Sequence, residues 1–254
     1  MYGAFKDNAT ATTLHPQDAN SLAVLFTAVD SPAKAQSISK NLLKNWGPIG
    51  AISPELPGNI SPFISGFEIA AHFSIGQTDR ALELIRRSWG WYINNPNGTE
   101  STVIEGYLQN GTFGYRSSRG YDYDASYVSH SHGWSSGPTS SLTTYVLGLS
   151  ILSPAGATWK LAPQFGDLTS VEGGFVTNLG KYQASWQIQT GGYTLDYEVP
   201  QATTGQIVLP CLTFGRFPSI TIDGRPISSD GEANIQGNGI VLKAQGGAHH
   251  ILVR

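Results

Sequence analysis

The sequence predicts an α + β protein with two domains: helical hairpins in residues 1–154 and an antiparallel β-sandwich in residues 155–254. Three observations carry this prediction. The first part spaces its apolar residues three and four positions apart, as amphipathic helices do. The second part alternates apolar and polar residues in short runs between turn signals. A chain of 254 residues is long enough for two ordinary domains.

The helical part contains five segments with this spacing. Ser31 and Ser61 each precede a proline, which is the usual pairing of an N-cap with a first helical residue. Thr78 is expected to cap the fourth segment. The segments cover residues 16–29, 31–46, 61–76, 78–92 and 137–149. The residues expected to face the core are Ala19, Leu22, Ala23, Phe26, Val29, Ala35, Ile38, Leu42, Trp46, Phe63, Phe67, Ala70, Ala71, Leu82, Ile85, Trp89, Leu142, Tyr145, Val146 and Leu149.

The helical segments form pairs, and the prolines that open the first and third, Pro16 and Pro62, lie 46 residues apart. That spacing is typical of stacked helical hairpins. Five helices are too few to close a toroid of such hairpins, so we expect the end of a larger arrangement. An open edge would expose apolar surface and permit self-association.

The β part begins after LSPAGATW and includes the alternating runs YQASWQIQ, YTLDYEV and GIVLKAQ. Gly-Gly at 191–192, Asp-Gly at 223–224 and Gly-Asn-Gly at 237–239 separate such runs as turns. The single cysteine, Cys211, lies in the run IVLPCLTF. Its place in a strand-like run predicts a buried and unreactive thiol.

The composition narrows the class of ligand. Charged residues are 13% of the chain, about half the usual share, and the net charge is -3. No basic run offers a surface to nucleic acid, and no apolar run approaches the roughly 20 residues that span a bilayer. We therefore expect neither a nucleic-acid nor a membrane partner. A polarity that rests on Ser, Thr, Asn, Gln and Gly suits a neutral, hydroxyl-rich ligand.

The localisation signals of the sequence point in different directions. Four sequons, at Asn8, Asn59, Asn97 and Asn110, favour a secreted and glycosylated protein. Asn59 is the poorest acceptor, because a proline follows its sequon serine. The opening segment MYGAFKDNATATTLHPQ has no apolar core of the signal-peptide kind. The alternatives are an intracellular protein or a native polypeptide that starts before Met1.

The run STVIEGYLQNGTFGYRSSRGYDYDASYVSHSHGW, residues 101–134, gathers the main candidate groups around Glu105. Val103 and Ile104 precede this glutamate, so desolvation can tune its protonation. Rings nearby can stack on the apolar faces of a sugar, and polar side chains can bond its hydroxyls. The alternative is a surface glutamate on a Gly/Ser-rich loop. The rings are Tyr107, Phe113, Tyr115, Tyr121, Tyr123, Tyr127 and Trp134; the polar groups are Asn110, Arg116, Ser117, Ser118 and Arg119.

The histidines of this run, His130 and His132, lie two apart and would share one face of a strand. No Cys or Glu stands at the spacing of a third ligand, so a metal site is not predicted. A hydrogen-bonding role beside a substrate or carboxylate and a purely structural role both stay open. His72 is expected to be a satisfied core histidine, and His249 and His250 are expected to be structural.

Other acidic residues offer alternatives. Asp122 and Asp124 could supply a second carboxylate, although an alternating acid pair in a Gly/Tyr loop is more often solvated. Glu55 and Glu68 bracket LPGNISPFISGF, and Glu68 lies one position from its helix's apolar stripe, which favours a structural role. The sequence contains no phosphate loop, Gly-x-Ser-x-Gly elbow or His-Glu-x-x-His motif, so no cofactor is expected.

Three blocks, SPFISGFEIAAHFSIGQTDRALELIRRSWGWYINNP, the run of residues 101–149 and WKLAPQFGDLTSVEGGF, resemble fungal α-L-rhamnosidases of glycoside hydrolase family 78. The resemblance covers roughly residues 14–190 and implies the C-terminal portion of such an enzyme. It implies the last part of an (α/α)6 six-hairpin toroid followed by a C-terminal β-sandwich. It also implies a secreted parent protein and a rhamnose-containing glycoside or polysaccharide as the ligand.

The family hydrolyses glycosides with inversion, using a carboxylic acid and a water-activating carboxylate. The resemblance implies that Glu105, in TVIEGY, is this general base and that Tyr107 matches the second aromatic of the family's Trp-Glu-x-Trp-like segment, with Ile104 in place of the first Trp. SHSH matches the Ser-x-Asn-His-like segment, so His132 inherits a contact with the substrate. Trp134, Arg116 and His130 complete the expected substrate-binding set.

The family's general acid lies in an earlier Asp/Arg-rich segment that residues 1–60 do not match. We therefore expect this chain alone to be inactive. Two alternatives remain: a shortened paralogue that binds sugar or a partner without catalysis, and an enzyme that uses Asp122 or Asp124 as its acid on another deoxy-sugar or a uronic acid.

Overall fold

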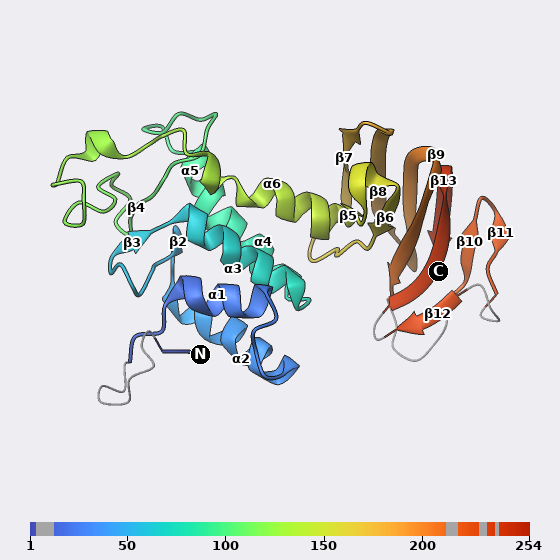
Figure 1. Ribbon diagram of the computed structural model, residues 1–254, viewed down its shortest axis with the longest axis horizontal. Coiled ribbons are helices and arrows are strands. Elements are labelled where there is room, and N and C mark those ends of the chain that lie inside the picture. The colour runs from blue at the N-terminus through green and yellow to red at the C-terminus, as the bar shows by residue number, and fades with distance from the viewer. Residues whose placement is uncertain (4–12, 212–217, 229–232, 237–238) are drawn as a thin grey trace. The chain divides into compact units, whose positions relative to one another are not determined.

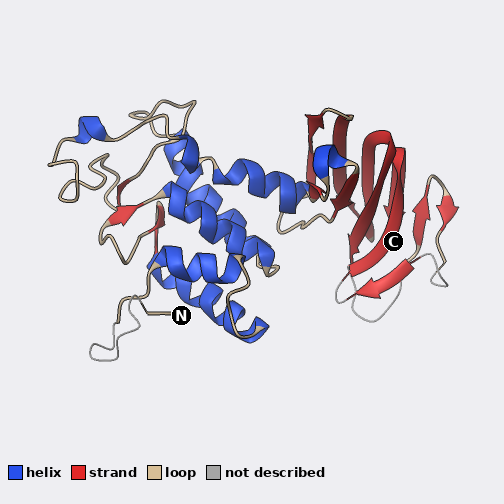
Figure 2. Cartoon of the chain, viewed as in Figure 1, coloured by secondary structure: helices blue, strands red, loops and turns tan. Residues whose placement is uncertain are grey.

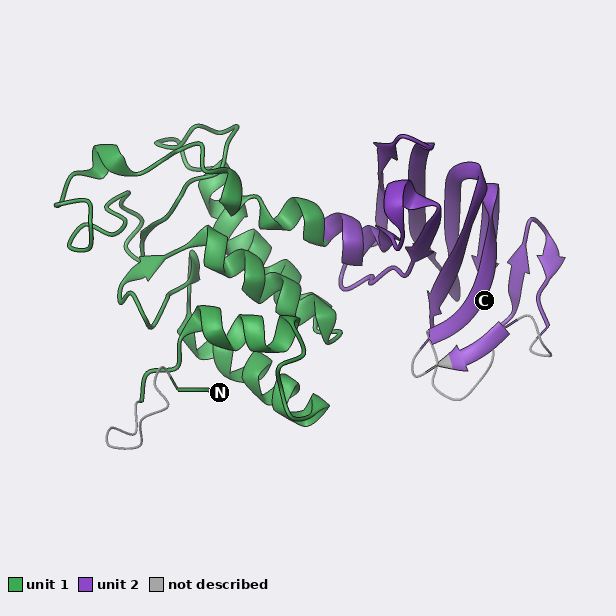
Figure 3. Ribbon diagram, viewed as in Figure 1, with its two compact units in different colours: residues 1–141 green, residues 142–254 purple. Residues whose placement is uncertain are grey.

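The computed structural model has a mixed α + β fold, with helices in the N-terminal half and a mostly antiparallel sheet in the C-terminal half (Figure 2). Internal contacts divide the chain into two compact units, Met1–Ser141 and Leu142–Arg254, coloured separately in Figure 3. The residues that the structure describes are 1–3, 13–211, 218–228, 233–236 and 239–254.

The first unit is built on helices that follow the predicted segments (Figure 1). Helix α3 contacts α1, α4 and α6, so it is central to the unit. The helices are α1 (Gln17–Leu25), α2 (Pro32–Leu42), η1 (Leu43–Asn45), α3 (Pro62–Ser74), α4 (Thr78–Ile85), the π-helix η2 (Arg86–Gly90), α5 (Trp91–Ile93), η3 (Ala125–Tyr127), η4 (Gly133–Ser135) and α6 (Gly137–Ser141). Two small ribbons join them: β1 (Trp46–Gly47) with β2 (Gly50–Ala51), and β3 (Asn59–Ile60) with β4 (Tyr107–Leu108).

The helix starts follow the predicted capping chemistry at two of three positions. Ser31 Oγ accepts a hydrogen bond from the Lys34 amide at 3.2 Å, and Ser61 Oγ accepts one from the Ile64 amide at 3.4 Å. Each satisfies an amide that the first helical turn leaves unpaired. The prediction for Thr78 is wrong: it is the first residue of α4, whose N-cap is Gln77, without a side-chain cap.

The prediction of the inward face of α1 is also wrong. Its buried residues are Gln17, Asn20, Ser21 and Val24, whereas Phe26, expected inside, is 68% exposed. Hydrogen bonds explain the burial of Gln17 and Asn20, whereas Ser21 Oγ has no hydrogen-bond partner among the described residues. Gln17 bonds to polar side chains of α3, and the Asn20 amide donates to the Pro16 carbonyl at 2.8 Å and the Tyr2 carbonyl at 3.0 Å. Buried polar groups that are fully paired can occupy a helix interface in place of apolar ones.

The second unit is a sheet whose two longest strands, β9 and β13, pair along most of their length. Both change neighbours midway: β9 pairs with β8 and then with β6, and β13 pairs with β12 and then with β10. Every described pair is antiparallel except β6–β9. The strands are β5 (Leu149–Ile151), β6 (Thr158–Leu161), β7 (Ser170–Thr177), β8 (Gly180–Gln189), β9 (Gly192–Pro210), β10 (Ile220–Ile222), β11 (Arg225–Pro226), β12 (Ala233–Gln236) and β13 (Gly239–Val253).

The sheet begins earlier in the chain than the sequence predicts. The π-helix η5 (Leu142–Leu147) ends before Leu149, which lies in β5 rather than in a helix. Strand β5 pairs with β6, and the Trp186 indole of β8 donates to the Val146 carbonyl of η5 at 2.9 Å. Strand pairing therefore draws residues before 155 into the second unit.

Cys211 is half-buried, directly after the end of β9, so the prediction of a buried thiol is wrong. Within the described part of the chain, no helix is long and apolar enough to cross a membrane.

Candidate active site

Two loop segments of the first unit bring the predicted site residues together. The Glu105 amide donates to the Ser129 carbonyl at 2.8 Å, and the His132 amide donates to the Val103 carbonyl at 2.8 Å. Residues 103–105 and 129–132 therefore run side by side. This pairing places Glu105 next to the segment that carries both predicted histidines, although the two segments are separated by more than twenty residues of sequence.

The Glu105 carboxylate is half-exposed and held at both oxygens. Tyr121 donates its hydroxyl hydrogen to Oε1 at 2.5 Å, and the Ser129 amide donates to Oε2 at 3.2 Å. The hydrogen bond to Glu105, followed by burial, raises the pKa of the Tyr121 hydroxyl above its ordinary value. A carboxylate held by two donors keeps one orientation, and a general base must be held within hydrogen-bond reach of the proton that it abstracts.

The floor beneath Glu105 is an aromatic core formed by Ile60, Tyr92, Ile104, Tyr107, Tyr115 and Val128. Gly106 lies against the face of Tyr115, where an added Cβ would come within 2.4 Å of the ring. Burial, as the largest influence, raises the pKa of Tyr115. Ile104 and Gly106, which flank Glu105, thus fix its backbone against this core.

Tyr107, expected to contact the substrate, is fully buried. Its hydroxyl donates to the Ile49 carbonyl at 2.7 Å and bonds with Ser88 Oγ at 2.8 Å. Its ring lies 4.4 Å from that of Trp91, centroid to centroid. Burial raises the pKa of this hydroxyl well above its ordinary value. In this position Tyr107 supports the loop of Glu105 from the core, as does the equally buried Ile104.

Arg116 lies on the outer side of Tyr121. Its guanidinium carbon is 5.4 Å from the Tyr121 ring centroid, a cation–π contact, and its Nε donates to the Arg119 carbonyl at 3.3 Å. The exposed ring of Tyr127 lies 5.9 Å from that of Tyr121. On this side, Glu105 is therefore bordered by the rings of Tyr121 and Tyr127 and by the Arg116 guanidinium.

The half-buried His132 and the exposed Trp134 form the other part of the site. Their ring centroids lie 5.3 Å apart, and Trp134 is 73% exposed. His130 is placed differently: its Nδ1 bonds with the Tyr92 hydroxyl at 3.0 Å, and its ring packs edge-on to Phe113 at 4.8 Å. The structure thus puts His132 and Trp134 at the surface, whereas His130 links the loop to the core.

A cavity of about 350 Å³ lies along the paired loops. No pattern in the sequence singles out Glu100, yet this exposed residue lines the cavity and has φ = 57°. A carboxylate in an irregular Asn-Gly-Thr-Glu stretch has no distinguishing sequence signal. The cavity is lined by Ile93, Glu100, Ser101, Thr102, Val103, Ser131 and Gly133.

The other acids of the run have different positions. Asp122 and Asp124 are both exposed. Asp124 caps η3 by accepting from the Ser126 amide at 2.9 Å, and the Ser126 hydrogen bonds lower its pKa. Glu55 caps α1, because its Oε2 accepts from the Gln17 amide at 2.9 Å and its Oε1 from the Asp18 amide at 3.3 Å. A carboxylate at a helix N-terminus also interacts favourably with the helix dipole.

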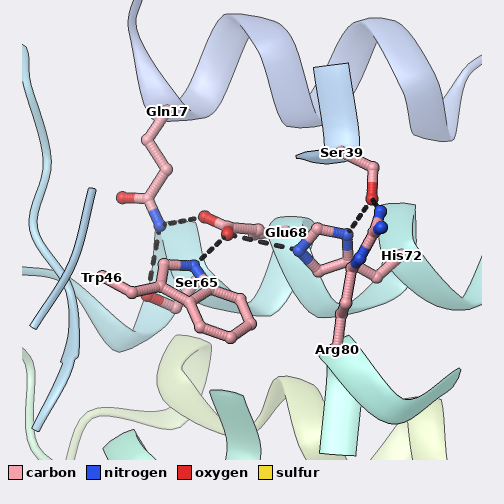
Figure 4. Close-up of polar contacts among 7 residues, drawn as sticks. All are labelled: Gln17, Ser39, Trp46, Ser65, Glu68, His72 and Arg80. Carbon is pink, nitrogen blue, oxygen red and sulfur yellow. Dashed lines mark hydrogen bonds and ion pairs between the residues drawn. The ribbon is translucent and has the colours of Figure 1, made fainter. Parts of the chain in front are cut away.

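Glu68 and His72 are fully buried and lie in a separate network (Figure 4). Glu68 Oε1 accepts from the Trp46 indole at 2.6 Å, and Oε2 accepts from the Gln17 amide at 2.7 Å. His72 lies 3.3 Å from Glu68 through Nε2 and 2.8 Å from Ser39 Oγ through Nδ1. These contacts confirm the prediction that His72 is a satisfied core histidine, and they place Glu68 in the same network.

The described residues contain no group of three or more His, Cys, Asp or Glu side chains arranged to hold a metal ion. The sequon residues also differ in placement. Asn97 and Asn110 are exposed, while Asn59 is buried and accepts from the Arg116 amide at 3.0 Å. Asn8 lies outside the described residues.

Comparison with known proteins adds a family relationship to this geometry. Residues 148–216 match the family of the bacterial α-L-rhamnosidase C-terminal domain. No curated protein matches the chain. The family match covers only part of the second unit, so what the comparisons show for the first unit is its fold alone.

Solved structures supply that fold. An α-L-rhamnosidase from Dictyoglumus thermophilum matches with a TM-score of 0.73 and 18% identity, over 94% of this chain and 25% of that one. The Streptomyces avermitilis α-L-rhamnosidase, solved with L-rhamnose, matches with a TM-score of 0.69 and 18% identity, over 94% of this chain and 21% of that one. The Aspergillus terreus α-L-rhamnosidase matches with a TM-score of 0.67 and 21% identity, over 94% of this chain and 24% of that one. The chain therefore has the fold of about a quarter of each enzyme's length.

Proposed function

We propose that the loop site of the first unit is the base half of an α-L-rhamnosidase active site, with Glu105 as the carboxylate that activates water. The observation that carries the proposal is the Glu105 carboxylate, half-exposed and oriented by the Tyr121 hydroxyl and the Ser129 amide. Two comparisons support the proposal: the fold match to an α-L-rhamnosidase, which covers 94% of the chain, and the family match of residues 148–216.

The surrounding residues receive roles that suit their exposure. Trp134 provides an exposed ring on which a sugar face can stack, and His132 beside it bonds a sugar hydroxyl. Arg116 orders Tyr121 through the cation–π contact and thereby orients Glu105. Tyr107 and His130 act from the core, as supports of the two loops.

Inverting hydrolysis needs a second group, a carboxylic acid that protonates the leaving oxygen, roughly 6.5–9.5 Å from the base. We assign this role to no residue of the chain. The isolated chain is therefore proposed to bind a rhamnoside and not to hydrolyse it. In the same proposal, the first unit is part of an (α/α)6 toroid and the second is a C-terminal β-sandwich.

A full-length α-L-rhamnosidase provides the test of the base. The glutamate that superposes on Glu105 is changed to Gln, and hydrolysis of p-nitrophenyl α-L-rhamnoside is measured beside rhamnose binding. Loss of a catalytic base lowers kcat by about 10²–10⁴-fold while the ligand still binds. A kcat equal to that of the unchanged enzyme would remove Glu105 from the mechanism.

The isolated chain tests the sugar contacts. Rhamnose is titrated into the chain and followed by nuclear magnetic resonance of the indole and imidazole signals. Trp134→Ala is expected to abolish the response, while Tyr123→Ala, an equally exposed ring of the same run, leaves it unchanged. A response that survives Trp134→Ala would contradict the proposed stacking. If the chain binds rhamnose but the Glu-to-Gln change leaves kcat of the full-length enzyme unchanged, the non-catalytic alternative is supported instead.

We also propose that the parent protein is secreted and carries glycans at Asn97 and Asn110. Both are exposed in loops, and Asn110 Oδ1 accepts from Thr112 Oγ1 at 2.8 Å within its own sequon. Asn59 is excluded by its burial and its hydrogen bonds. Peptide mass spectrometry after expression in a secreting eukaryotic host, with and without glycosidase, measures occupancy at each site.

A further inference from the structure

The second unit carries a larger cavity than the loop site, with a volume of about 700 Å³, within the range of small-ligand pockets. It lies over β7, β8, β9 and β13, and its lining includes Asp223, which follows β10. None of the groups discussed for the active site lines it. Its chemistry follows from the register of these four strands, which are labelled in Figure 1.

The strand register gathers polar side chains into two rows on one face of the sheet. Glu172, Ser185, Asp196 and His250 are successive cross-strand partners. Two residues further along, Gln183 pairs with Glu198 and Glu198 with Ala248. Residues two apart on a strand lie on the same face, so these rows are neighbours. Between them lies the row of Ala184, Tyr197 and His249, which also line the cavity.

Two histidine–aspartate pairs fix the end of the cavity. His250 Nδ1 donates to Asp196 Oδ1 at 2.6 Å, and His249 Nδ1 donates to Asp223 Oδ2 at 2.8 Å. Asp223 Oδ1 also accepts from the His250 amide at 2.9 Å. With Nδ1 held by a carboxylate, Nε2 of the imidazole is left to bond a ligand. Nε2 of His250 has no hydrogen-bond partner among the described residues.

The described lining is rich in acceptors and contains no lysine or arginine. Of its four carboxylates, those of Glu172 and Glu198 have no partner within the described part of the chain. A uronic acid or a phosphate would meet repulsion here. The Gln183 amide and the Ser185 hydroxyl add donors to the lining. An ammonium ion has no acceptor and would leave these donors unpaired. Hydroxyl groups both donate and accept, so they match the whole lining.

We propose that this cavity binds a neutral saccharide whose hydroxyls donate to the carboxylates of Asp196 and Glu198. The site is separate from Glu105 and does not depend on the proposed hydrolytic role. Vicinal hydroxyls of a sugar ring meet the two carboxylates across neighbouring rows, and Nε2 of His250 accepts a further hydroxyl.

The experiment uses the full chain on an array of neutral, uronic-acid and amino-sugar oligosaccharides, followed by calorimetry with the best neutral probe. Capture by neutral saccharides and not by uronic acids is expected. Loss of one charge-assisted hydrogen bond in Glu198→Gln is expected to raise the dissociation constant about 10-fold or more. Glu198 is exposed, so this variant keeps the fold, which circular dichroism verifies. Asp196→Asn is expected to act in the same direction.

Matched controls separate this site from the first one. Gln187→Ala changes an exposed residue of β8 outside the cavity lining and is expected to leave the affinity unchanged, as is Glu105→Gln. The absence of capture by any neutral saccharide would overturn the proposal. So would capture of uronic acids or amino sugars alone, or an affinity that Glu105→Gln lowers and Glu198→Gln does not.

Discussion

The Tyr121 hydroxyl donates to Glu105 Oε1, and the Arg116 guanidinium lies over the same tyrosine ring. Each residue of this chain of contacts comes from a different part of the loop run, so the carboxylate depends on tertiary structure for its orientation. The Ser129 amide holds the second oxygen. The site is therefore defined by two loops that the backbone hydrogen bonds of residues 103–105 and 129–132 keep together.

This relationship predicts that Glu105→Gln lowers the pKa of Tyr121. The phenol's pKa is raised chiefly because it donates to the Glu105 carboxylate, and a neutral amide removes that cause. The measurement is the pH titration of the tyrosine Cζ resonance. Asp122→Asn, a nearby exposed acid without a described contact to Tyr121, is the control and should leave the titration in place. An unchanged Tyr121 titration in Glu105→Gln would contradict the hydrogen bond.

Gly106 gives a second prediction. A Cβ at this position would come within 2.4 Å of the Tyr115 ring, and that ring is nearly buried in the aromatic core. We expect Gly106→Ala to lower the free energy of unfolding by about 1–3 kcal/mol, since the ring or the loop must move. Urea denaturation measures the loss. Gly133→Ala, where an added Cβ has no neighbour within 4 Å, is the matched control in the same site.

The buried network gives a third prediction. Glu68→Ala removes the acceptor of the Trp46 indole and of the Gln17 amide and leaves His72 without its carboxylate. Leaving two donors of this buried network without their acceptor is expected to lower the free energy of unfolding by about 2–6 kcal/mol. Thermal and urea denaturation measure the effect.

A matched control for Glu68 lies on the next helix. Glu83 pairs with Arg87 at 2.6 Å with the same i, i+4 spacing, but both side chains are exposed by a third or more. Glu83→Ala should cost less than about 0.5 kcal/mol, because solvent screens the pair. Equal losses in the two variants would show that burial does not set the strength of the Glu68 contacts.

Helices α1, α2 and α3 show what the sequence could and could not predict. Serine–proline pairs determine helix starts locally, so the beginnings of α2 and α3 were predicted correctly. The inward face of α1 was not, because Gln17 acquires its partners from α3 and the loop before it, and Asn20 acquires one from Tyr2. A pattern that counts apolar residues cannot identify an interface made of paired polar groups.

The site shows the same division. Glu105, His132 and Trp134 were identified from the sequence by resemblance, and the structure brings the first two onto paired loops. Whether they act in catalysis stays a prediction. The part played by Tyr121 could not be predicted, since a tyrosine among many in a Gly-rich run has no distinguishing signal. Tyr107 has the spacing of a site residue, but strand pairing of β3 with β4 turns it into the core.

Asp223 gives the last prediction, which concerns pH. The amide of His250 and then the ring of His249 lower the pKa of this carboxyl. The unfolded chain therefore binds the proton more readily, so Asp223 stabilises the fold above its unfolded pKa of about 3.9 and loses that effect as the pH falls through the folded value. Because 48% of the side chain is exposed, the effect at neutral pH is about 0.5–1 kcal/mol. Asp223→Asn should show this loss in urea denaturation at pH 7, and the difference should shrink as the pH falls through the folded pKa of Asp223. Asp30→Asn, an exposed loop residue, serves as the control. A difference between Asp223→Asn and the parent chain that stays constant at every pH would show that the contacts of Asp223 do not depend on its charge.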